Sequence, residues 1–240
     1  MKSLSIELFP LAENAAVIYF NSQQQVNLLP MMQQFQARIE REPFYGYEEM
    51  TTAYMSAALY YDPMKVWDIS RGELPSTWVM KWIDERFRSM HFHEGGSSSR
   101  LIEIPVCYGG TWGPDLEEAA NGLRIGRQEL IERHCGPTYT VQMIGFAPGF
   151  PYLQGLDPSL AVPRKSVPRK TVAAGSVGIG GGQTGIYPLE LPGGWNVIGR
   201  TPLRLFMPEM NPPVLIQAGD QIRFVPIDEA QYWKLKQGGE

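Results

Sequence analysis

The segment at residues 175–199 constrains this chain more than any other, because almost every second residue in it is Gly or Pro. Glycine allows close backbone approach and positive φ, and proline stiffens the turns between them. That composition is typical of short strands joined by tight turns. The wider segment 139–201 interleaves these residues with arginines, aromatics and hydrogen-bonding side chains. We therefore expect a rigid, loop-rich surface that carries a binding or active site.

Composition places the chain among soluble globular proteins and narrows its partners. With 240 residues, 43% hydrophobic and 19% charged, it can bury a sizeable core as one large domain or two small ones. The formal net charge is −4, so the chain has no overall positive potential to attract anionic partners. We therefore expect no nucleic-acid or membrane partner. Pro10, Glu13 and Asn14 interrupt the first apolar stretch, which is unlike a signal peptide or membrane span. We expect a cytoplasmic protein.

Cysteine and histidine are too few to indicate a disulfide framework or a metal site. Cys107 and Cys135 do not form a CxxC motif, and His91 and His93 form the one HxH, so no metal is expected. No Ser-His-Asp or Cys-His arrangement follows from the spacing of these residues. A role for Cys107 or His134 as nucleophile or base has little support, and the catalytic residues stay unknown.

The first part of the chain predicts a small α+β domain. The patterns indicate strands at residues 5–9, 15–20, 49–54 and 57–61, and helices at residues 27–40 and 76–90. Leu28, Met32, Phe35 and Ile39 have the spacing of one face of an amphipathic helix, and Ser76 is a candidate N-cap of the second helix. The order ββαββα over residues 1–94 predicts helices on one face of an antiparallel sheet. The run GGSSS at residues 95–99 is typical of a linker.

The second part, residues 100–240, predicts a mainly-β domain. Strands are expected at residues 100–106, 139–146, 171–177, 195–198, 204–207 and 221–225, and helices at residues 115–121, 126–134 and 228–237. Asp115 could cap the first of these helices, where it and Glu117 are typical helix-start charges. Many short strands separated by Gly/Pro turns favour a β-barrel or a closed sheet.

The run GGGQTG at residues 180–185 formally matches the dinucleotide fingerprint GxGxxG. That site requires the loop to open a helix, whereas here it leads into Ile186, Tyr187 and Pro188. The run is not followed by the GK[ST] sequence that a P-loop requires. Neither kind of nucleotide loop is therefore expected here.

Substrate-binding residues are expected among the polar side chains of the Gly/Pro-rich segment. The candidates are Arg169, Gln183, Thr184, Tyr187 and Arg200. Arginine binds carboxylates through two parallel hydrogen bonds, so we expect one or two of Arg164, Arg169 and Arg200 to hold a carboxylated substrate. The other candidates would orient it through hydrogen bonds.

Aromatic and proline residues provide the candidate wall of the pocket. They are Phe146, Pro148, Phe150 and Trp195. The turn GFAPGFPY at residues 145–152 suits two uses equally well, an apolar pocket wall or a hydrophobic plug that closes a barrel end. Both interpretations stay open at this point.

Four long motifs of this chain resemble the allophanate hydrolase subunit 1 family. They are IPVCYGGTWGPDLEEAA at residues 104–120, MIGFAPGFPYL at 143–153, VPRKTVAAGSVGIGGGQTGIYP at 167–188 and PGGWNVIGRTP at 192–202. The resemblance covers essentially the whole chain. It implies an α+β N-terminal domain and a cyclophilin-like β-barrel C-terminal domain. A cyclophilin-like fold does not imply prolyl isomerase activity, because function depends on the site.

The resemblance also implies partners and two kinds of function. The family includes the B subunit of a three-component 5-oxoprolinase, which opens 5-oxoproline to L-glutamate. That reaction implies ATP, bound at an unknown place, a homologous C subunit (KipA-like) and a LamB/YcsF-type A subunit. A component of the allophanate hydrolase or urea carboxyltransferase type is a related possibility. The alternative is a KipI-like inhibitor that binds a sporulation-type sensor histidine kinase and blocks its autophosphorylation.

Overall fold

The computed structural model describes residues 4–22, 28–92 and 100–238. The chain divides into two compact units, Met1–Ser98 and Ser99–Glu240. The linker expected at residues 95–99 lies outside the described residues. None of the described helices has the length and apolar character needed to cross a membrane.

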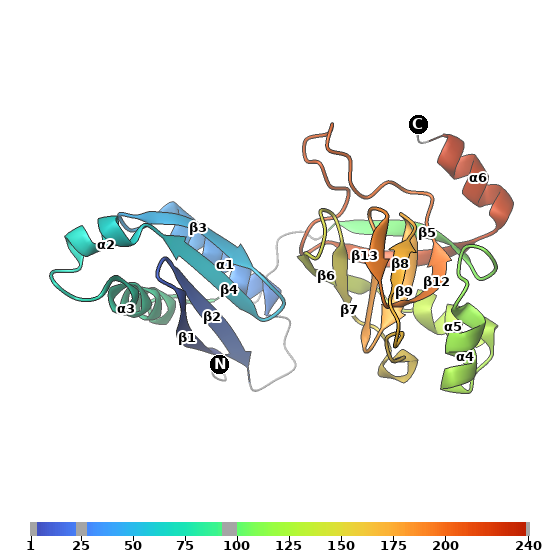
Figure 1. Ribbon diagram of the computed structural model, residues 1–240, viewed down its shortest axis with the longest axis horizontal. Helices are drawn as coiled ribbons and strands as arrows, with labels where there is room; N and C mark the ends of the chain where they lie inside the picture. Colours follow the sequence, from blue (N-terminus) through green and yellow to red (C-terminus); the bar gives the residue numbers. More distant parts are fainter. Residues whose placement is uncertain (1–3, 23–27, 93–99, 239–240) are drawn as a thin grey trace. The chain divides into compact units, whose positions relative to one another are not determined.

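The N-terminal unit is a four-stranded antiparallel sheet with helices packed against it (Figure 1). Its elements are β1 (Leu4–Ala12), β2 (Ala15–Ser22), α1 (Leu29–Arg41), β3 (Tyr47–Thr52), β4 (Ser56–Tyr61), α2 (Pro63–Ile69) and α3 (Pro75–Arg88). The strand order is β1-β2-β4-β3. Alternate residues of the central strands, such as Phe20 and Leu59, share one core with Phe35 of α1 and Ile83 of α3. This alternation puts the helices on one face of the sheet.

Two details of this unit differ from the sequence-based expectation. The short helix α2 was not predicted, and it begins where Asp62 accepts hydrogen bonds from the backbone N–H groups of Met64 (2.9 Å) and Lys65 (3.2 Å). Ser76 is not the N-cap of α3, because that helix begins one residue earlier at Pro75. Proline suits the first helical position, since its fixed φ is helical and its missing N–H has no partner there. The element order is thus ββαββαα.

The C-terminal unit is built on a closed seven-stranded barrel with the order β10-β7-β6-β13-β5-β12-β9. Its elements are β5 (Leu101–Tyr108), α4 (Leu116–Leu123), α5 (Arg127–Cys135), β6 (Tyr139–Ile144), β7 (Pro151–Gln154), η1 (Pro158–Leu160), β8 (Arg169–Val172), β9 (Ser176–Gly180), β10 (Gln183–Ile186), β11 (Leu191–Gly193), β12 (Asn196–Arg200), β13 (Gln221–Ile227) and α6 (Glu229–Gln237). Val106, Ile179 and Phe224 belong to its buried apolar core. The predicted fold class, an α+β domain followed by a mainly-β barrel, is confirmed.

Two predicted strands of this unit are wrong. Residues 171–177 form parts of β8 and β9, separated by a turn at Gly175. Gly175 has a φ of +82°, and a Cβ there would lie 2.4 Å from the carbonyl oxygen of Thr201, so the chain must turn on a glycine. Residues 204–207 contribute only the isolated bridge between Phe206 and Val214. The terminal helix is confirmed, and Asp228 forms a capping box at its start.

Candidate functional site

A cleft of about 310 Å³ opens among the turns of the Gly/Pro-rich segment, within the C-terminal unit. Its aromatic lining is Phe146, Phe150, Tyr152, Tyr187 and Trp195. Two cations, Arg164 and Lys165, also line it, together with Pro168 and the backbone turn at residues 192–194. Strands β7 and β11, the residue that follows β10, and the loops before β7, before β8 and after β11 therefore meet at one place. An apolar hollow with a few polar groups at its edge is the usual form of a small-molecule site.

Phe150 is the centre of the aromatic packing in this cleft. It is buried, and its ring centre lies 5.0 Å from that of Tyr152, 5.4 Å from Tyr187 and 5.5 Å from Trp195. Phe146 contacts the same ring at 5.4 Å, but 61% of Phe146 is exposed. One turn therefore supplies both a buried plug, Phe150, and an exposed wall, Phe146. Phe146 has a φ of +69°, an unfavourable backbone conformation of the kind that clusters at functional sites.

Two glycines allow the large rings to lie against the backbone. A Cβ at Gly180 would lie 2.3 Å from the indole of Trp195. A Cβ at Gly193 would lie 2.3 Å from the hydroxyl of Tyr187. Both distances are too short for any side chain, so the shape of the cleft depends on the absence of side chains at these positions.

Arg164 is the exposed cation at the mouth of the cleft. Its guanidinium carbon lies 5.8 Å from the ring centre of Trp195, a cation–π contact. Within the described residues it has no ion pair or hydrogen bond to another side chain. Burial raises the pKa of the nearby Tyr187 hydroxyl, and a hydrogen bond from the backbone N–H of Trp195 and the positive charge of Arg164 offset that rise only in part. Tyr187 therefore stays protonated at neutral pH and can donate a hydrogen bond.

A buried carboxylate, Asp115, binds Lys165, the second cation that lines the cleft. Arg169 donates two hydrogen bonds to Asp115, at 2.8 and 2.6 Å, and the backbone N–H of Val197 donates a third at 2.7 Å. The ammonium group of Lys165 lies 3.1 Å from Asp115 and 2.6 Å from Glu118. Burial alone would raise the pKa of Asp115, but these donors outweigh it and hold the pKa below its usual value. Asp115 therefore joins α4, β8, β12 and the loop that carries Lys165.

The structure brings some of the predicted site residues together and separates others. Tyr187 and the predicted wall residues other than Pro148 line the cleft, while Pro148 is exposed in the adjoining turn. Gln183 is partly exposed at the start of β10 and does not line the cleft. Thr184 is fully buried, and its hydroxyl donates to the carbonyl oxygen of Gly178 at 3.1 Å. Arg200 lines a different groove.

Sequence reasoning missed the arrangement around Asp115. It treated Asp115 as a helix-start charge and Arg169 as free to bind substrate, whereas the two side chains bind each other. Asp115 occupies the N-cap position of α4 but makes no capping hydrogen bond. Lys165 and Tyr152 were not named as cleft residues either. The one signal in the sequence was that these residues all belong to Gly/Pro-rich stretches.

A chain of hydrogen bonds crosses the barrel behind the cleft. Thr184 donates to the carbonyl oxygen of Gly178, so it must accept from Nε2–H of His134 at 2.9 Å. Nδ1 of His134 is then the acceptor for the Tyr108 hydroxyl at 2.8 Å, and the thiol of Cys135 donates to Tyr108 at 3.4 Å. Burial lowers the pKa of His134 to about 3. The imidazole is therefore neutral at physiological pH, and its role is to satisfy buried polar groups.

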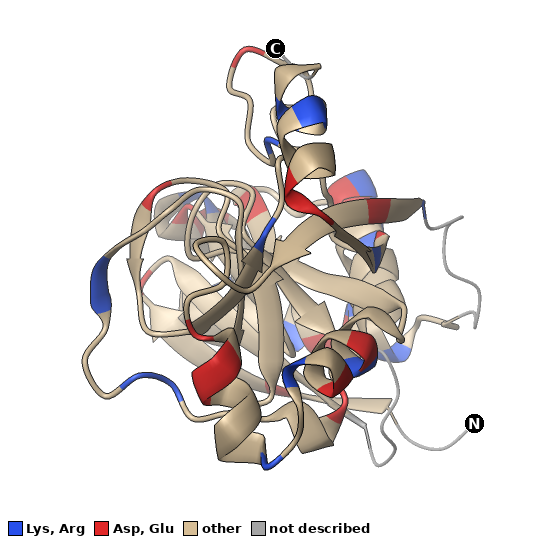
Figure 2. Cartoon of the chain, turned by 90° about the vertical axis from the view of Figure 1, so that its right-hand side faces the viewer, with Lys and Arg blue, Asp and Glu red and all other residues tan. Residues whose placement is uncertain are grey.

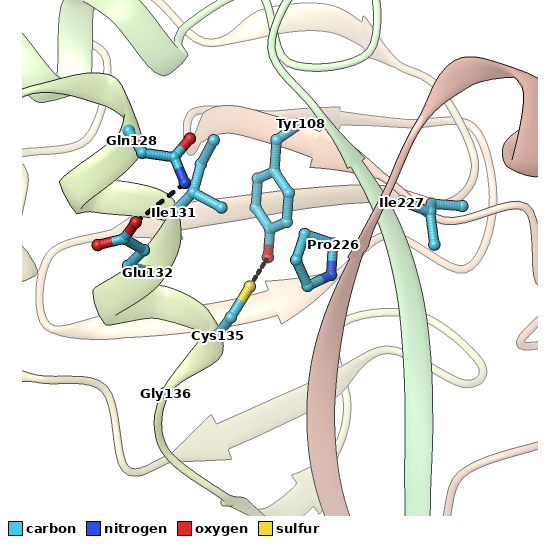
Figure 3. A pocket seen from close by; sticks show the side chains of 8 residues that line it. All are labelled: Tyr108, Gln128, Ile131, Glu132, Cys135, Gly136, Pro226 and Ile227. Atoms are coloured by element: carbon cyan, nitrogen blue, oxygen red, sulfur yellow. Dashed lines mark hydrogen bonds between the residues drawn. The ribbon is translucent and has the colours of Figure 1, made fainter.

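Tyr108 and Cys135 also face a hollow of about 430 Å³ between α5 and the strand pair β5–β13 (Figure 3). Figure 3 shows the thiol of Cys135 pointing to the Tyr108 hydroxyl, and Gln128 hydrogen bonded to Glu132 at 3.0 Å. Burial raises the pKa of Cys135, which disfavours the reactive thiolate. The aromatic cleft, with its unpaired cation, is therefore the better candidate for a functional site.

Among the described residues, no group of three or more His, Cys, Asp or Glu side chains is arranged to hold a metal ion. The GGGQTG run connects β9 to β10 as a tight hairpin, with Gly181 at a φ of +63°. It does not begin a helix, in agreement with the argument against a dinucleotide loop.

Comparisons with known proteins identify the family. The model of the carboxyltransferase domain, subdomain C and D, matches residues 6–216. The chain belongs to this carboxyltransferase-domain family. The family resemblance inferred from the motifs is thereby confirmed.

Curated relatives of this carboxyltransferase-domain protein carry one name. The 5-oxoprolinase B subunit of Bacillus subtilis (strain 168) is 42% identical over 229 residues, which are 95% of this chain and 95% of the relative. A protein of the same name from Escherichia coli O157:H7 is 52% identical over 131 residues, 55% of this chain and 60% of that one. These names describe the relatives as parts of a multi-subunit enzyme.

Solved structures resemble this chain as well. PH0987 from Pyrococcus horikoshii is 37% identical, with a TM-score of 0.55 over 95% of this chain and all of that one. TTHA0988 is 30% identical with a TM-score of 0.73 over 89% of this chain, which spans only 40% of the TTHA0988 chain. Urea amidolyase from Kluyveromyces lactis matches 98% of this chain and 15% of its own at a TM-score of 0.80 and 18% identity, and so shares the fold.

Proposed function

We propose that this chain is the B subunit of an ATP-dependent 5-oxoprolinase, which hydrolyses 5-oxoproline to L-glutamate. The observation that carries the proposal is the 42% identity to a protein of that name over 95% of both chains. Its partners in the proposal are a homologous C subunit and a LamB/YcsF-type A subunit. ATP is consumed by the assembled complex.

The aromatic cleft suits the chemistry of 5-oxoproline. This substrate is a small five-membered lactam ring that carries one carboxylate. The exposed guanidinium of Arg164 is unpaired among the described residues and is the natural partner for that carboxylate. Arg169, our sequence-based choice for this role, already binds Asp115 through both terminal nitrogens. Arg164 therefore takes its place in the proposal.

The remaining cleft residues bind and orient the substrate in this proposal. Phe146 and Trp195 supply apolar surface for the ring, and Tyr187 is a hydrogen-bond donor at the same cleft. A lactam carbonyl is unreactive, and polarising groups are needed to stabilise the charge that develops on its oxygen. We assign those polarising groups to the partner subunits. In this proposal, residues of a partner complete the aromatic cleft of this chain at their interface.

The proposal is tested by reconstitution. We would co-express the chain with these two partners and measure glutamate formed from 5-oxoproline, with and without ATP. ATP-dependent glutamate that disappears when this chain is omitted supports the proposal. An assembled complex that forms no glutamate contradicts it, and would favour the carboxyltransferase or kinase-inhibitor function instead.

The same assay tests Arg164. We expect Arg164→Gln to raise KM for 5-oxoproline by about 10- to 100-fold with a smaller effect on kcat, because a charge-assisted hydrogen bond to the substrate carboxylate is lost. The control is Arg127→Gln, which removes a cation that is 70% exposed and pairs with Glu117 at 3.3 Å. An unchanged KM for the Arg164 variant would exclude this anchor.

A further inference from the structure

A second groove, of about 330 Å³, lies in the C-terminal unit between α6, the turn at residues 174–175 and the segment 200–208. All of its charged lining residues are cations: Arg200, Arg204 and Lys236. Figure 2 shows that Lys and Arg are otherwise interspersed with Asp and Glu over this side of the C-terminal unit. A hollow lined by one sign of charge is therefore a local feature, which concentrates ions of the opposite sign.

The side chain of Arg200 is held in place by contacts with Ala174 and Trp112. Its Nε–H donates to the carbonyl oxygen of Ala174 at 2.7 Å, and its guanidinium carbon lies 5.9 Å from the ring centre of Trp112. Its two terminal amino groups have no hydrogen bond within the described part of the chain. These two amino groups are hydrogen-bond donors in a fixed position and have no partner among the described residues. Such donors are suited to binding an anion.

Aromatic stacking also positions helix α6, which forms the other side of the groove. The ring centre of Tyr232 in α6 lies 4.1 Å from that of Trp112, so α6 packs on the same indole that supports Arg200. This contact holds Lys236, one turn later, at the rim of the groove. Arg204 is partly neutralised, because Glu209 binds it at 3.0 Å. Three cations with one countercharge leave an excess positive charge of about two.

We propose that this groove binds a ligand that carries two or more linked phosphates. A single carboxylate would neutralise only part of the excess charge, whereas a diphosphate spreads several negative charges over many acceptor oxygens. Pro188, Phe206 and Tyr232 add apolar surface beside the cations, where a base or another ring attached to the phosphates could pack. The groove is distinct from the aromatic cleft, since the two share no lining residue.

The test is direct binding to the purified full-length chain, measured by isothermal titration calorimetry. The probes are inorganic pyrophosphate, ATP and acetate. We expect pyrophosphate and ATP to bind and acetate to show no measurable heat. Equal affinities of pyrophosphate and ATP assign binding to the phosphates alone, and tighter binding of ATP adds a contact to the nucleoside.

Variants then locate the site. We expect Arg200→Gln to weaken pyrophosphate binding by about tenfold or more, and Lys236→Gln by a smaller factor, because each removes a charge-assisted donor. Lys234→Gln is the matched control, since Lys234 is on the same helix but does not line the groove. Thermal unfolding of each variant checks that it is folded. Lys236 is exposed, so its variant remains informative even if Arg200→Gln does not fold.

Two results would overturn the inference. One is the absence of pyrophosphate and ATP binding at millimolar concentration, and the other is equal weakening by Lys234→Gln and Lys236→Gln, which would indicate a diffuse charge effect. Because the experiment measures binding without turnover, it is independent of the proposed reaction. A complex that failed to open 5-oxoproline could still bind pyrophosphate here.

Discussion

His134 shows how much a single buried side chain contributes to the behaviour of the barrel. It is fully buried, stacks on Phe224 with a centroid distance of 4.5 Å, and both of its ring nitrogens are hydrogen bonded. The groups packed around it, the hydroxyls of Tyr108, Tyr139 and Thr184, are neutral. No described carboxylate pairs with it to stabilise an imidazolium, so protonation of the folded protein is unfavourable.

This environment predicts a loss of stability in mild acid. The pKa of His134 is about 3 in the folded protein and about 6.5 in the unfolded chain, which therefore takes up a proton first as the pH falls. The stabilisation is complete above pH 6.5 and decreases toward pH 3, by about 2 kcal/mol at pH 5. Urea unfolding at pH 7 and pH 5 measures this difference.

His134→Gln should be less stable at pH 7 but should lose about 2 kcal/mol less than the wild type between pH 7 and pH 5. The control is His91→Gln, since His91 is exposed and outside the barrel. If the two variants have the same pH dependence, the protonation of His134 is not what destabilises the protein.

At the scale of residues, the sequence identified the right segment but not the right pairs. Tyr187, Phe146, Phe150 and Trp195 were chosen because aromatic and polar residues between glycines form pockets, and they do line one. Arg169 was chosen for the same reason, yet it binds Asp115, 54 residues earlier in the chain. A partner so distant has no local pattern, because tertiary packing of strand β8, in its separate two-stranded sheet, against the start of α4 brings the two together.

At the scale of elements, the hairpin β9–β10 supports the ring of Trp195, which lines the cleft. Gly180 at its end lies beneath the indole of Trp195, whereas Gly182 in the turn has open space around it. The two glycines are close in sequence and differ in what a side chain would meet. They therefore provide a matched pair for testing the packing of Trp195.

We expect Gly180→Ala to destabilise the protein by about 1–3 kcal/mol, because the new methyl group would displace the indole ring or the strand. Gly182→Ala should change stability by less than about 0.5 kcal/mol, since its methyl group meets no atom within van der Waals contact. Unfolding curves in urea measure both, and near-UV circular dichroism reports changes in aromatic packing, that of Trp195 included. Equal stability of the two variants would refute the close approach.

Elements with a regular period were predictable and the shortest ones were not. The helices α1, α4 and α5 and the strands β1, β2 and β4 follow apolar patterns of period 3.6 or 2. Strands β7, β10 and β11 have three or four residues each, too few to show an alternation. The barrel order also had no local signal, because neighbouring strands such as β5 and β12 are distant in sequence.

At the scale of the whole molecule, each unit has its own apolar core. One cluster includes Phe20, Phe35 and Ile83, and the other includes Val106, Ile179 and Phe224. Every strand of each sheet finds its partners within the same unit. Separate cores and separate sheets are the properties of domains that can fold alone.

This division predicts two unfolding transitions. Differential scanning calorimetry of the full chain should resolve two components, because a two-state transition is expected for each domain and not for the pair. A fragment of residues 100–240 should reproduce one component with its own midpoint. A single transition for the full chain together with an unfolded fragment would show that the two units depend on each other.

The parallel pairing of β5 with β13 has a consequence for synthesis on the ribosome. These strands pair from Leu101–Gln221 to Cys107–Ile227, so the barrel is closed by the first and last strands of its unit. Domains whose strands pair over such long sequence separations fold slowly. The barrel cannot close until nearly the whole polypeptide has been made, whereas the N-terminal unit can fold well before. A chain that stops before β13 would leave β5 and β6 with exposed edges, which favour aggregation.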